Sequence, residues 1–141
     1  MRDLAHGIVR DAEGATKFIK VTVRGGQSES DCLIVAFSIA NSPLVKTAMF
    51  ASDANWGRIV MAIGKTALVL DQTKIDLYIG DVLLMSRGEK NPDYVESMGA
   101  EVMSREEITI SVNLNVGNAV ETVWTSDLSQ DYVAINADYR S

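Results

Sequence analysis

The stretch from Ile108 to Leu114 constrains the fold most, because its residues alternate strictly between apolar and polar types. A period of two is that of a β-strand with one buried face, so the stretch predicts a strand in a layered domain. A second strand is expected at residues 119–125, after the turn-forming residues 115–118. We expect these two strands to pair as an antiparallel ribbon.

The same kind of pattern predicts three more strands. Residues 17–23 are rich in Ile, Val and Thr and end at a pair of glycines, which is typical of a strand. Residues 74–79 alternate, Gly80-Asp81 has turn chemistry, and residues 82–85 can return beside the first arm, which predicts a hairpin. The polar stretch 86–93 is the best loop candidate.

Residues 30–41 predict a helix that Ser28 caps, with Asp31 three residues further on as in a capping box. This helix is apolar nearly all round, which indicates burial on more than one face. It should stop before Pro43, because proline disfavours the helical conformation in the residue before it. The apolar residues 44–50 are ambiguous between helix and strand.

Three further helices are expected: residues 54–66 with Asp53 as the cap, residues 94–103, and a final helix that begins after Ser126. All these elements together predict an α+β fold, a layered α/β sandwich with a mixed, largely antiparallel sheet and packed helices. A length of 141 residues fits this as one domain.

Composition excludes several classes of function. The formal net charge of −6 argues against nucleic acid or an anionic membrane as a partner. The one cysteine, Cys32, lies in an apolar run and is best interpreted as an inert buried thiol, and the one histidine, His6, has no catalytic partners. We therefore expect no internal disulfide and no metal site. No apolar run reaches the ~18 to 20 residues that span a bilayer, so we expect a cytoplasmic protein.

Local pattern leaves the role of the candidate site residues open. Glu13 sits in a turn of small residues before strand 17–23, where its carboxylate could hold an amine, although a turn carboxylate facing water is the commoner case. Asn136 and Ser141 offer hydrogen-bonding groups near the C-terminus, and helix capping or solvation is the commoner role for them. Trp56 is expected to pack, with Arg58 as a candidate partner for an acid.

Four motifs occur in order along the chain. They are Arg10-Asp11-Ala12-Glu13-Gly14-Ala15-Thr16-Lys17-Phe18, Ile39-Ala40-Asn41-Ser42-Pro43-Leu44-Val45-Lys46-Thr47-Ala48, Asn55-Trp56-Gly57-Arg58-Ile59, and Asp131-Tyr132-Val133 with Ile135-Asn136-Ala137 and Tyr139-Arg140-Ser141. From end to end the chain thus resembles the C-terminal part of the bifunctional ornithine acetyltransferase (glutamate N-acetyltransferase) family of arginine biosynthesis. The resemblance implies that residues 1–141 are the C-terminal portion of a β chain. Residues 1–50 would continue the catalytic sandwich, and residues 51–141 would form a C-terminal α+β region.

Members of this family cleave themselves into an α chain and a β chain that begins with a nucleophilic threonine. The resemblance implies an acetyl-threonine intermediate that carries acetyl from N-acetylornithine to glutamate, without a cofactor; bifunctional members also accept acetyl-CoA. The nucleophile, the oxyanion-hole donors and the substrate lysine lie upstream, so this chain would contain no catalytic residue and would be inactive alone. Its partners would be the α chain and the missing part of the β chain, in a hetero-oligomer.

Position by position, the family's substrate-binding residues fall on Glu13, Asn136 and Ser141. Glu13 would attract an amine, and Asn136 and Ser141 would hydrogen-bond the amino-acid head group. Ala54 departs from the family, which has proline before Asn-Trp-Gly-Arg. A different hypothesis is a stand-alone binding or structural domain that has kept the fold without the chemistry.

Overall fold

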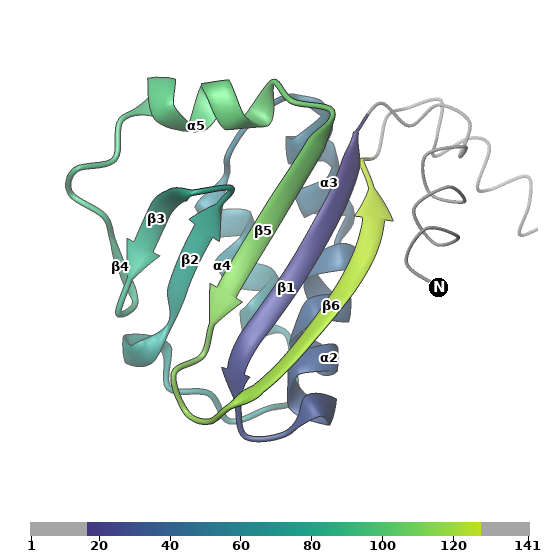
Figure 1. Ribbon diagram of the computed structural model, residues 1–141, viewed down its shortest axis with the longest axis vertical. Helices are drawn as coiled ribbons and strands as arrows, with labels where there is room; N and C mark the ends of the chain where they lie inside the picture. Colours follow the sequence, from purple (N-terminus) through teal and green to yellow (C-terminus); the bar gives the residue numbers. More distant parts are fainter. Residues whose placement is uncertain (1–16, 128–141) are drawn as a thin grey trace, which may run out of the picture.

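The computed structural model describes residues 17–127, which form a six-stranded sheet with helices packed on one face (Figure 1). The strand order is β4-β3-β2-β5-β1-β6, and of the neighbouring pairs in this described sheet β1 and β5 are parallel while the others are antiparallel. The strands are β1 (Phe18–Gly26), β2 (Asp76–Ile79), β3 (Val82–Ser86), β4 (Glu89–Lys90), β5 (Glu107–Asn113) and β6 (Ala119–Ser126).

The helices give the domain its second layer. Helices α2, α3 and α4 lie behind the sheet in the view of Figure 1, and α5 crosses its upper end. Their bounds are α2 (Glu29–Ala40), α3 (Pro43–Phe50), α4 (Trp56–Gly64) and α5 (Glu96–Met103), with a short 3-10 turn at Gln72–Lys74. The expected α+β architecture, with a mixed and largely antiparallel sheet, is confirmed.

The core forms where the apolar residues of the alternating strands meet these helices. From Ile19 to Val23 in β1 and from Ile108 to Val112 in β5, every second residue is fully or almost fully buried, while the residues between them are half-buried. Because a period of two places alternate side chains on opposite faces, this burial pattern is what the alternation predicts. The buried members are Ile19, Val21 and Val23 of β1 and Ile108, Ile110 and Val112 of β5.

Local capping chemistry explains where the helices begin. The Ser28 hydroxyl accepts a hydrogen bond from the backbone N–H of Asp31 at 3.1 Å, which confirms the expected start of α2. The ambiguous stretch 44–50 is a helix, because Ser42 caps it and Pro43 occupies its first turn, where proline is pre-organised. In α4 the expected cap was wrong. Asn55, not Asp53, accepts from the N–H of Arg58 at 3.2 Å, so the helix begins at Trp56.

The predicted hairpin is confirmed as β2 and β3, and α5 falls within the helix expected at 94–103. The expected loop at 86–93 was wrong in part, since Glu89–Lys90 pair with Met85 and Ser86 as the short strand β4. The final helix expected after Ser126 lies outside the described residues, and Ser126 itself ends β6.

The antiparallel ribbon expected between residues 108–114 and 119–125 was wrong, because β1 lies between β5 and β6. The link between the two strands crosses the end of β1 instead of turning back. There the N–H groups of Leu114 and Val116 donate to the carbonyls of Arg24 and Gly25 at 2.9 and 2.8 Å. Bridging two strand spacings needs about 10 Å, which a five-residue link can span. The same local sequence therefore fits either topology.

Among residues 17–127, no individual helix has the length and apolar character to span a bilayer; only α2 and α3 together, bent by 57°, would satisfy that test.

Candidate functional site

The two ends of the described chain meet at one corner of the sheet. The backbone N–H of Lys17 donates to Oδ1 of Asp127 at 3.1 Å, and the N–H of Asp127 donates to the Lys17 carbonyl at 3.2 Å. Asp127 is completely buried. The start of β1 and the end of β6 therefore lie side by side (Figure 1). We call this pair of residues the end closure.

Helix α3 ends at the same corner and holds the Lys17 side chain. The Lys17 ammonium donates to the carbonyl of Met49 and to the hydroxyl of Ser52, both at 2.6 Å. A helix C-terminus carries partial negative charge and unpaired carbonyls, so it is a favourable place for a cation. Burial lowers the pKa of Lys17, and the nearby Asp127 charge opposes that shift.

Ser52 also joins this corner to an open cavity of about 420 Å³. The chain turns sharply at Ser52, which has a φ of 57°, a left-handed conformation that L-residues adopt rarely. The cavity lies between the α3–α4 connection and α5, and its residues are Ser52, Asp53, Ala54, Asn55, Trp56, Lys90, Tyr94, Glu96 and Ala100.

The cavity carries charges of both signs. Asp53 and Glu96 supply carboxylates, and Lys90 supplies an ammonium group. Burial raises the pKa of Tyr94, and the charges of Glu96 and Asp53 raise it further, so the phenol stays protonated and can donate a hydrogen bond. The cavity can therefore hold a small polar molecule, but its side chains do not form a nucleophile and base pair.

The residues predicted to bind substrate are not among those described. Glu13 lies before Lys17, and Asn136 and Ser141 lie after Asp127, so all three fall outside residues 17–127. Arg140 does too. Their roles stay predictions.

Three other sequence predictions can be compared with the structure. Trp56 packs against the core, as expected. The Arg58 guanidinium donates to the Leu44 carbonyl at 2.9 Å and the Thr47 hydroxyl at 3.4 Å, so within residues 17–127 it joins α4 to α3 and is not bonded to an acid. Cys32 is fully buried and its thiol lies 3.4 Å from the Ala119 carbonyl; burial raises its pKa, as expected of an inert thiol.

Sequence reasoning missed Lys17 and Asp127 as features of the site. They are 110 positions apart, and no local pattern links the first residue of a predicted strand to a residue just after Ser126, where the sequence predicted the start of a helix. The missing signal is the pairing of β1 with β6. In the described part of the chain, no group of three His, Cys, Asp or Glu side chains is placed to hold a metal ion.

Comparison with known proteins gives a consistent result along the whole chain. A family model described as the ArgJ family matches residues 1–141. The chain is 52% identical over 140 residues to the arginine biosynthesis bifunctional protein ArgJ of Pseudomonas fluorescens (strain Pf0-1). That alignment covers 99% of this chain and 35% of the relative. It is 55% identical over 139 residues to the protein of the same name from Psychrobacter arcticus, and that alignment covers 98% of this chain and 34% of the relative.

A solved structure shows the same fold. The crystal structure of the arginine biosynthesis bifunctional protein argJ from Bacillus halodurans superimposes with a TM-score of 0.90 at 42% sequence identity. The match covers 97% of this chain and 64% of that chain. The chain therefore spans about a third of the length of the curated relatives that it matches.

Proposed function

This chain belongs to the ArgJ family, and we propose that it is the C-terminal portion of the β chain of a glutamate/ornithine N-acetyltransferase of arginine biosynthesis. The enzyme moves acetyl from N2-acetylornithine, and in bifunctional members also from acetyl-CoA, to glutamate through an acetyl-threonine intermediate. The nucleophilic threonine lies in the upstream part, and this chain supplies substrate-binding residues. The proposed location is the cytoplasm.

The end closure is the observation that supports this proposal most. Lys17 and Asp127 are bonded to each other, so the stretch that carries Glu13 and the stretch that carries Asn136 and Ser141 are both attached to the described domain at one corner. Glu13 is four residues from Lys17, which limits its distance to about 14 Å, and Asn136 is nine residues from Asp127, which limits its distance to about 31 Å. Chain length therefore allows all three side chains to reach a common site.

In this proposal the three residues divide the recognition of an amino acid between them. The Glu13 carboxylate attracts the substrate amine by charge, and Asn136 and Ser141 hydrogen-bond the head group. In the described corner, the Lys17 ammonium is held by the Met49 carbonyl and the Ser52 hydroxyl at the end of α3, four residues along the chain from Glu13.

The partners follow from the length of the relatives. This chain matches about a third of them, so we propose that the active unit also contains the α chain and the upstream part of the β chain, as a hetero-oligomer. The division of the chain at residue 50 stays a prediction. The described residues up to 50 contribute β1, and those from 51 onward contribute β2 to β6, to the same sheet.

The test uses Glu13→Ala in this chain, completed with the upstream part of the Pseudomonas fluorescens relative. Loss of a charge-assisted hydrogen bond of ~2–3 kcal/mol predicts a fall of roughly 30- to 150-fold in acetyl transfer from N-acetylornithine to glutamate. The Tm should move by less than about 2 °C. Glu29→Ala, at an exposed acid on α2, is the control and should leave transfer unchanged.

Two results would count against the proposal. Equal losses of activity and Tm in Glu13→Ala would identify Glu13 as a structural turn residue. Absence of transfer in the completed wild-type protein would favour the alternative, a stand-alone binding or structural domain that has kept the fold without the chemistry.

A further inference from the structure

The open cavity beside α5 is lined by three charged side chains from three different elements. Asp53 comes from the α3–α4 connection, Lys90 from β4, and Glu96 from the first turn of α5. In the described part of the chain, the ion pair of α5 joins its own last turn to the residue after it, and no ion pair joins either cavity carboxylate to the Lys90 ammonium. The three charges therefore meet at one cavity without neutralising one another.

Hydrogen bonds fix the segments that carry these charges. The backbone N–H of Asp53 donates to the Ala48 carbonyl of α3 at 2.9 Å. Asn91 holds the connection between β4 and α5, because its backbone N–H donates to the Leu84 carbonyl at 2.9 Å and its side-chain amide donates to the Leu83 carbonyl at 3.0 Å. Since these segments are already held in place, a ligand pays little of the cost of ordering them.

Tyr94 forms one wall of the cavity and is packed tightly against α5. Gly99 of α5 is buried, and a Cβ there would collide with the Tyr94 phenol and lie 3.2 Å from the Cβ of Ala54. The absence of a side chain therefore lets α5 approach the cavity wall closely. The charges of Glu96 and Asp53 both act on the Tyr94 phenol and raise its pKa, so the two carboxylates lie near one hydroxyl donor.

The charges of the cavity define the chemistry of the ligand that fits it. Two carboxylates, one ammonium group and a neutral phenol give the cavity a net charge of −1. Electrostatic complementarity favours a ligand with two cationic groups and one carboxylate. A dibasic amino acid has these charges at neutral pH, namely an α-ammonium, a side-chain cation and an α-carboxylate. The cavity volume of about 420 Å³ also lies in the usual range for small-molecule sites, about 300–1,000 Å³.

We propose that this cavity binds a dibasic amino acid, with Asp53 and Glu96 on its two cationic groups and Lys90 on its carboxylate. The Tyr94 hydroxyl donates a further hydrogen bond to the same ligand. The inference uses only residues within 17–127, so it does not depend on the proposed acetyl transfer. It also uses none of the three residues predicted to bind the transferase substrate.

Calorimetric titration of the full 141-residue chain with L-lysine tests the ligand class. L-lysine should bind at neutral pH with a Kd of about 1 mM or tighter. Two analogues each lack one of the charges: L-norleucine has no side-chain ammonium, and cadaverine has no carboxylate. Each should bind at least about 10-fold more weakly than L-lysine, because one charge-assisted hydrogen bond is lost.

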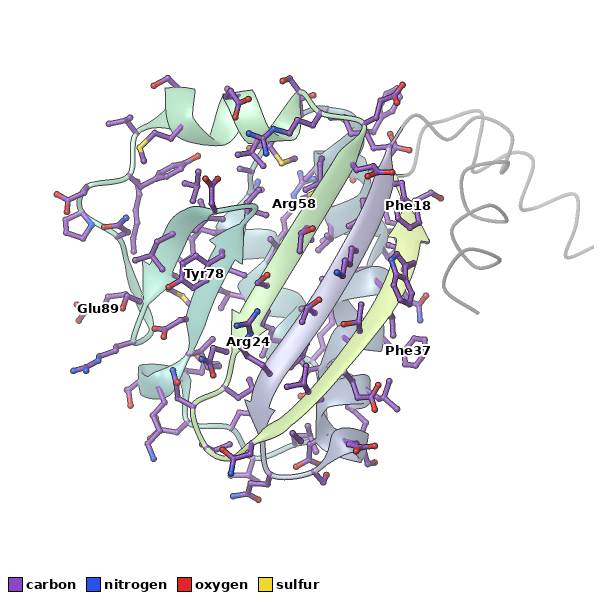
Figure 2. All side chains as sticks on the ribbon, in the orientation of Figure 1. Phe18, Arg24, Phe37, Arg58, Tyr78 and Glu89 are labelled. Carbon is purple, nitrogen blue, oxygen red and sulfur yellow. The ribbon has the colours of Figure 1, made fainter. Side chains whose placement is uncertain are left out.

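Substitutions assign each charge of the ligand to a side chain. Lys90→Gln should weaken L-lysine at least about 10-fold and leave cadaverine unaffected or bound more tightly, whereas Glu96→Gln should weaken both. Lys90 and Glu96 are exposed, so circular dichroism of the variants should match the wild type. Glu89→Gln is the matched control and should bind normally. Figure 2 shows Glu89 at the β4 edge of the sheet, and it is not among the cavity residues.

A variant outside the cavity separates this site from the predicted substrate-binding residues. Glu13→Ala should bind L-lysine as tightly as the wild type, because the cavity supplies all the contacts. The same titration is then repeated on the chain completed with the upstream part of the Pseudomonas fluorescens relative, where the cavity should still bind L-lysine.

Each outcome decides the inference independently of the proposed function. It is overturned if L-lysine does not bind, if either analogue binds as tightly as L-lysine, or if Lys90→Gln and Glu96→Gln bind normally. Loss of binding in Glu13→Ala also overturns it, because it assigns the ligand to the predicted substrate-binding residues. Loss of binding in the completed protein overturns it too, since the upstream part would then fill the cavity. Retained binding supports the site whether or not the completed protein transfers acetyl.

Discussion

Replacing Asp127 by alanine should loosen the end closure and with it the candidate site. The Asp127 carboxylate is buried and accepts a hydrogen bond from the backbone N–H of Lys17 at 3.1 Å. Its charge also favours the Lys17 ammonium, whose pKa it raises against the effect of burial. Alanine removes both interactions but leaves the backbone bond from the Asp127 N–H to the Lys17 carbonyl intact.

The expected magnitude follows from the chemistry of that bond. A hydrogen bond to a charged acceptor contributes about 1.5–3 kcal/mol to the free energy of unfolding. For a chain of 141 residues, the entropy of unfolding is ~0.3 kcal/mol per kelvin. Asp127→Ala should therefore lower the Tm by about 5–10 °C. Asp127→Asn keeps an acceptor oxygen and loses only the charge, so its Tm should fall by less than half as much.

The assay combines thermal unfolding with kinetics of the completed enzyme, measured well below the lower Tm. In Asp127→Ala the KM for glutamate and for N-acetylornithine should rise together, because one of the two hydrogen bonds between Lys17 and Asp127 is lost and the chain segments attached to them are held less firmly. Asp127→Asn should show a smaller rise. Two variants with the Tm and KM of the wild type would refute the end closure as a support for the site.

Two further predictions test the topology and the pH response. Gly117→Ala would place a Cβ against the carbonyl oxygen of Gly26, so it should lower the free energy of unfolding in urea by about 1–3 kcal/mol. Gly57→Ala is the control: its Cβ meets only a side-chain oxygen at 3.5 Å, so it should be neutral or stabilising. Equal effects of the two substitutions would contradict the close crossing of residues 114–118 over the end of β1. The hydroxyl and the backbone N–H of Thr73 donate hydrogen bonds to the Asp71 carboxylate and lower the pKa of Asp71. The ionised Asp71 carboxylate therefore stabilises the fold above its ordinary pKa of 3.8, and this stabilisation is lost as the pH falls through the lowered pKa. Asp71→Asn should therefore be less stable than wild type near neutral pH, and the gap should close in strong acid; a gap independent of pH would show that the charge is not responsible.

Periodic patterns predicted most of the secondary structure because each depends only on neighbouring residues. The alternation of residues 108–114 reports which side chains face the core, and Ser28 caps a helix through a bond to a residue three positions away. Asp53 was chosen as a cap where Asn55 performs that role, since both residue types accept the same hydrogen bond. Side-chain type alone does not distinguish Asp53 from Asn55 as the N-cap of α4, because the two residues lie only two positions apart.

Strand order depends on distant residues, and it was the main error. Residues 115–118 fit both a hairpin turn and a link that crosses over the end of β1. The crossing is found because β1 pairs with β5 on one side and with β6 on the other. The candidate site shows the same division. The family motifs predict a role for Glu13, Asn136 and Ser141, while the contact between Lys17 and Asp127 required the three-dimensional structure.

The alternation of the strands and the end closure are nevertheless connected. Phe18 of β1 pairs with Ser126 of β6, and this antiparallel register places Lys17 opposite Asp127. A slip of one residue would turn the buried face of β1 outward, so the register is fixed by the burial of its apolar residues. The pattern that builds the core therefore also places Lys17 and Asp127 opposite each other, and these are the described residues nearest in sequence to the predicted site residues. Under the proposed function, a substitution that weakens the β1–β6 pair should therefore lower the stability of the domain and weaken substrate binding together.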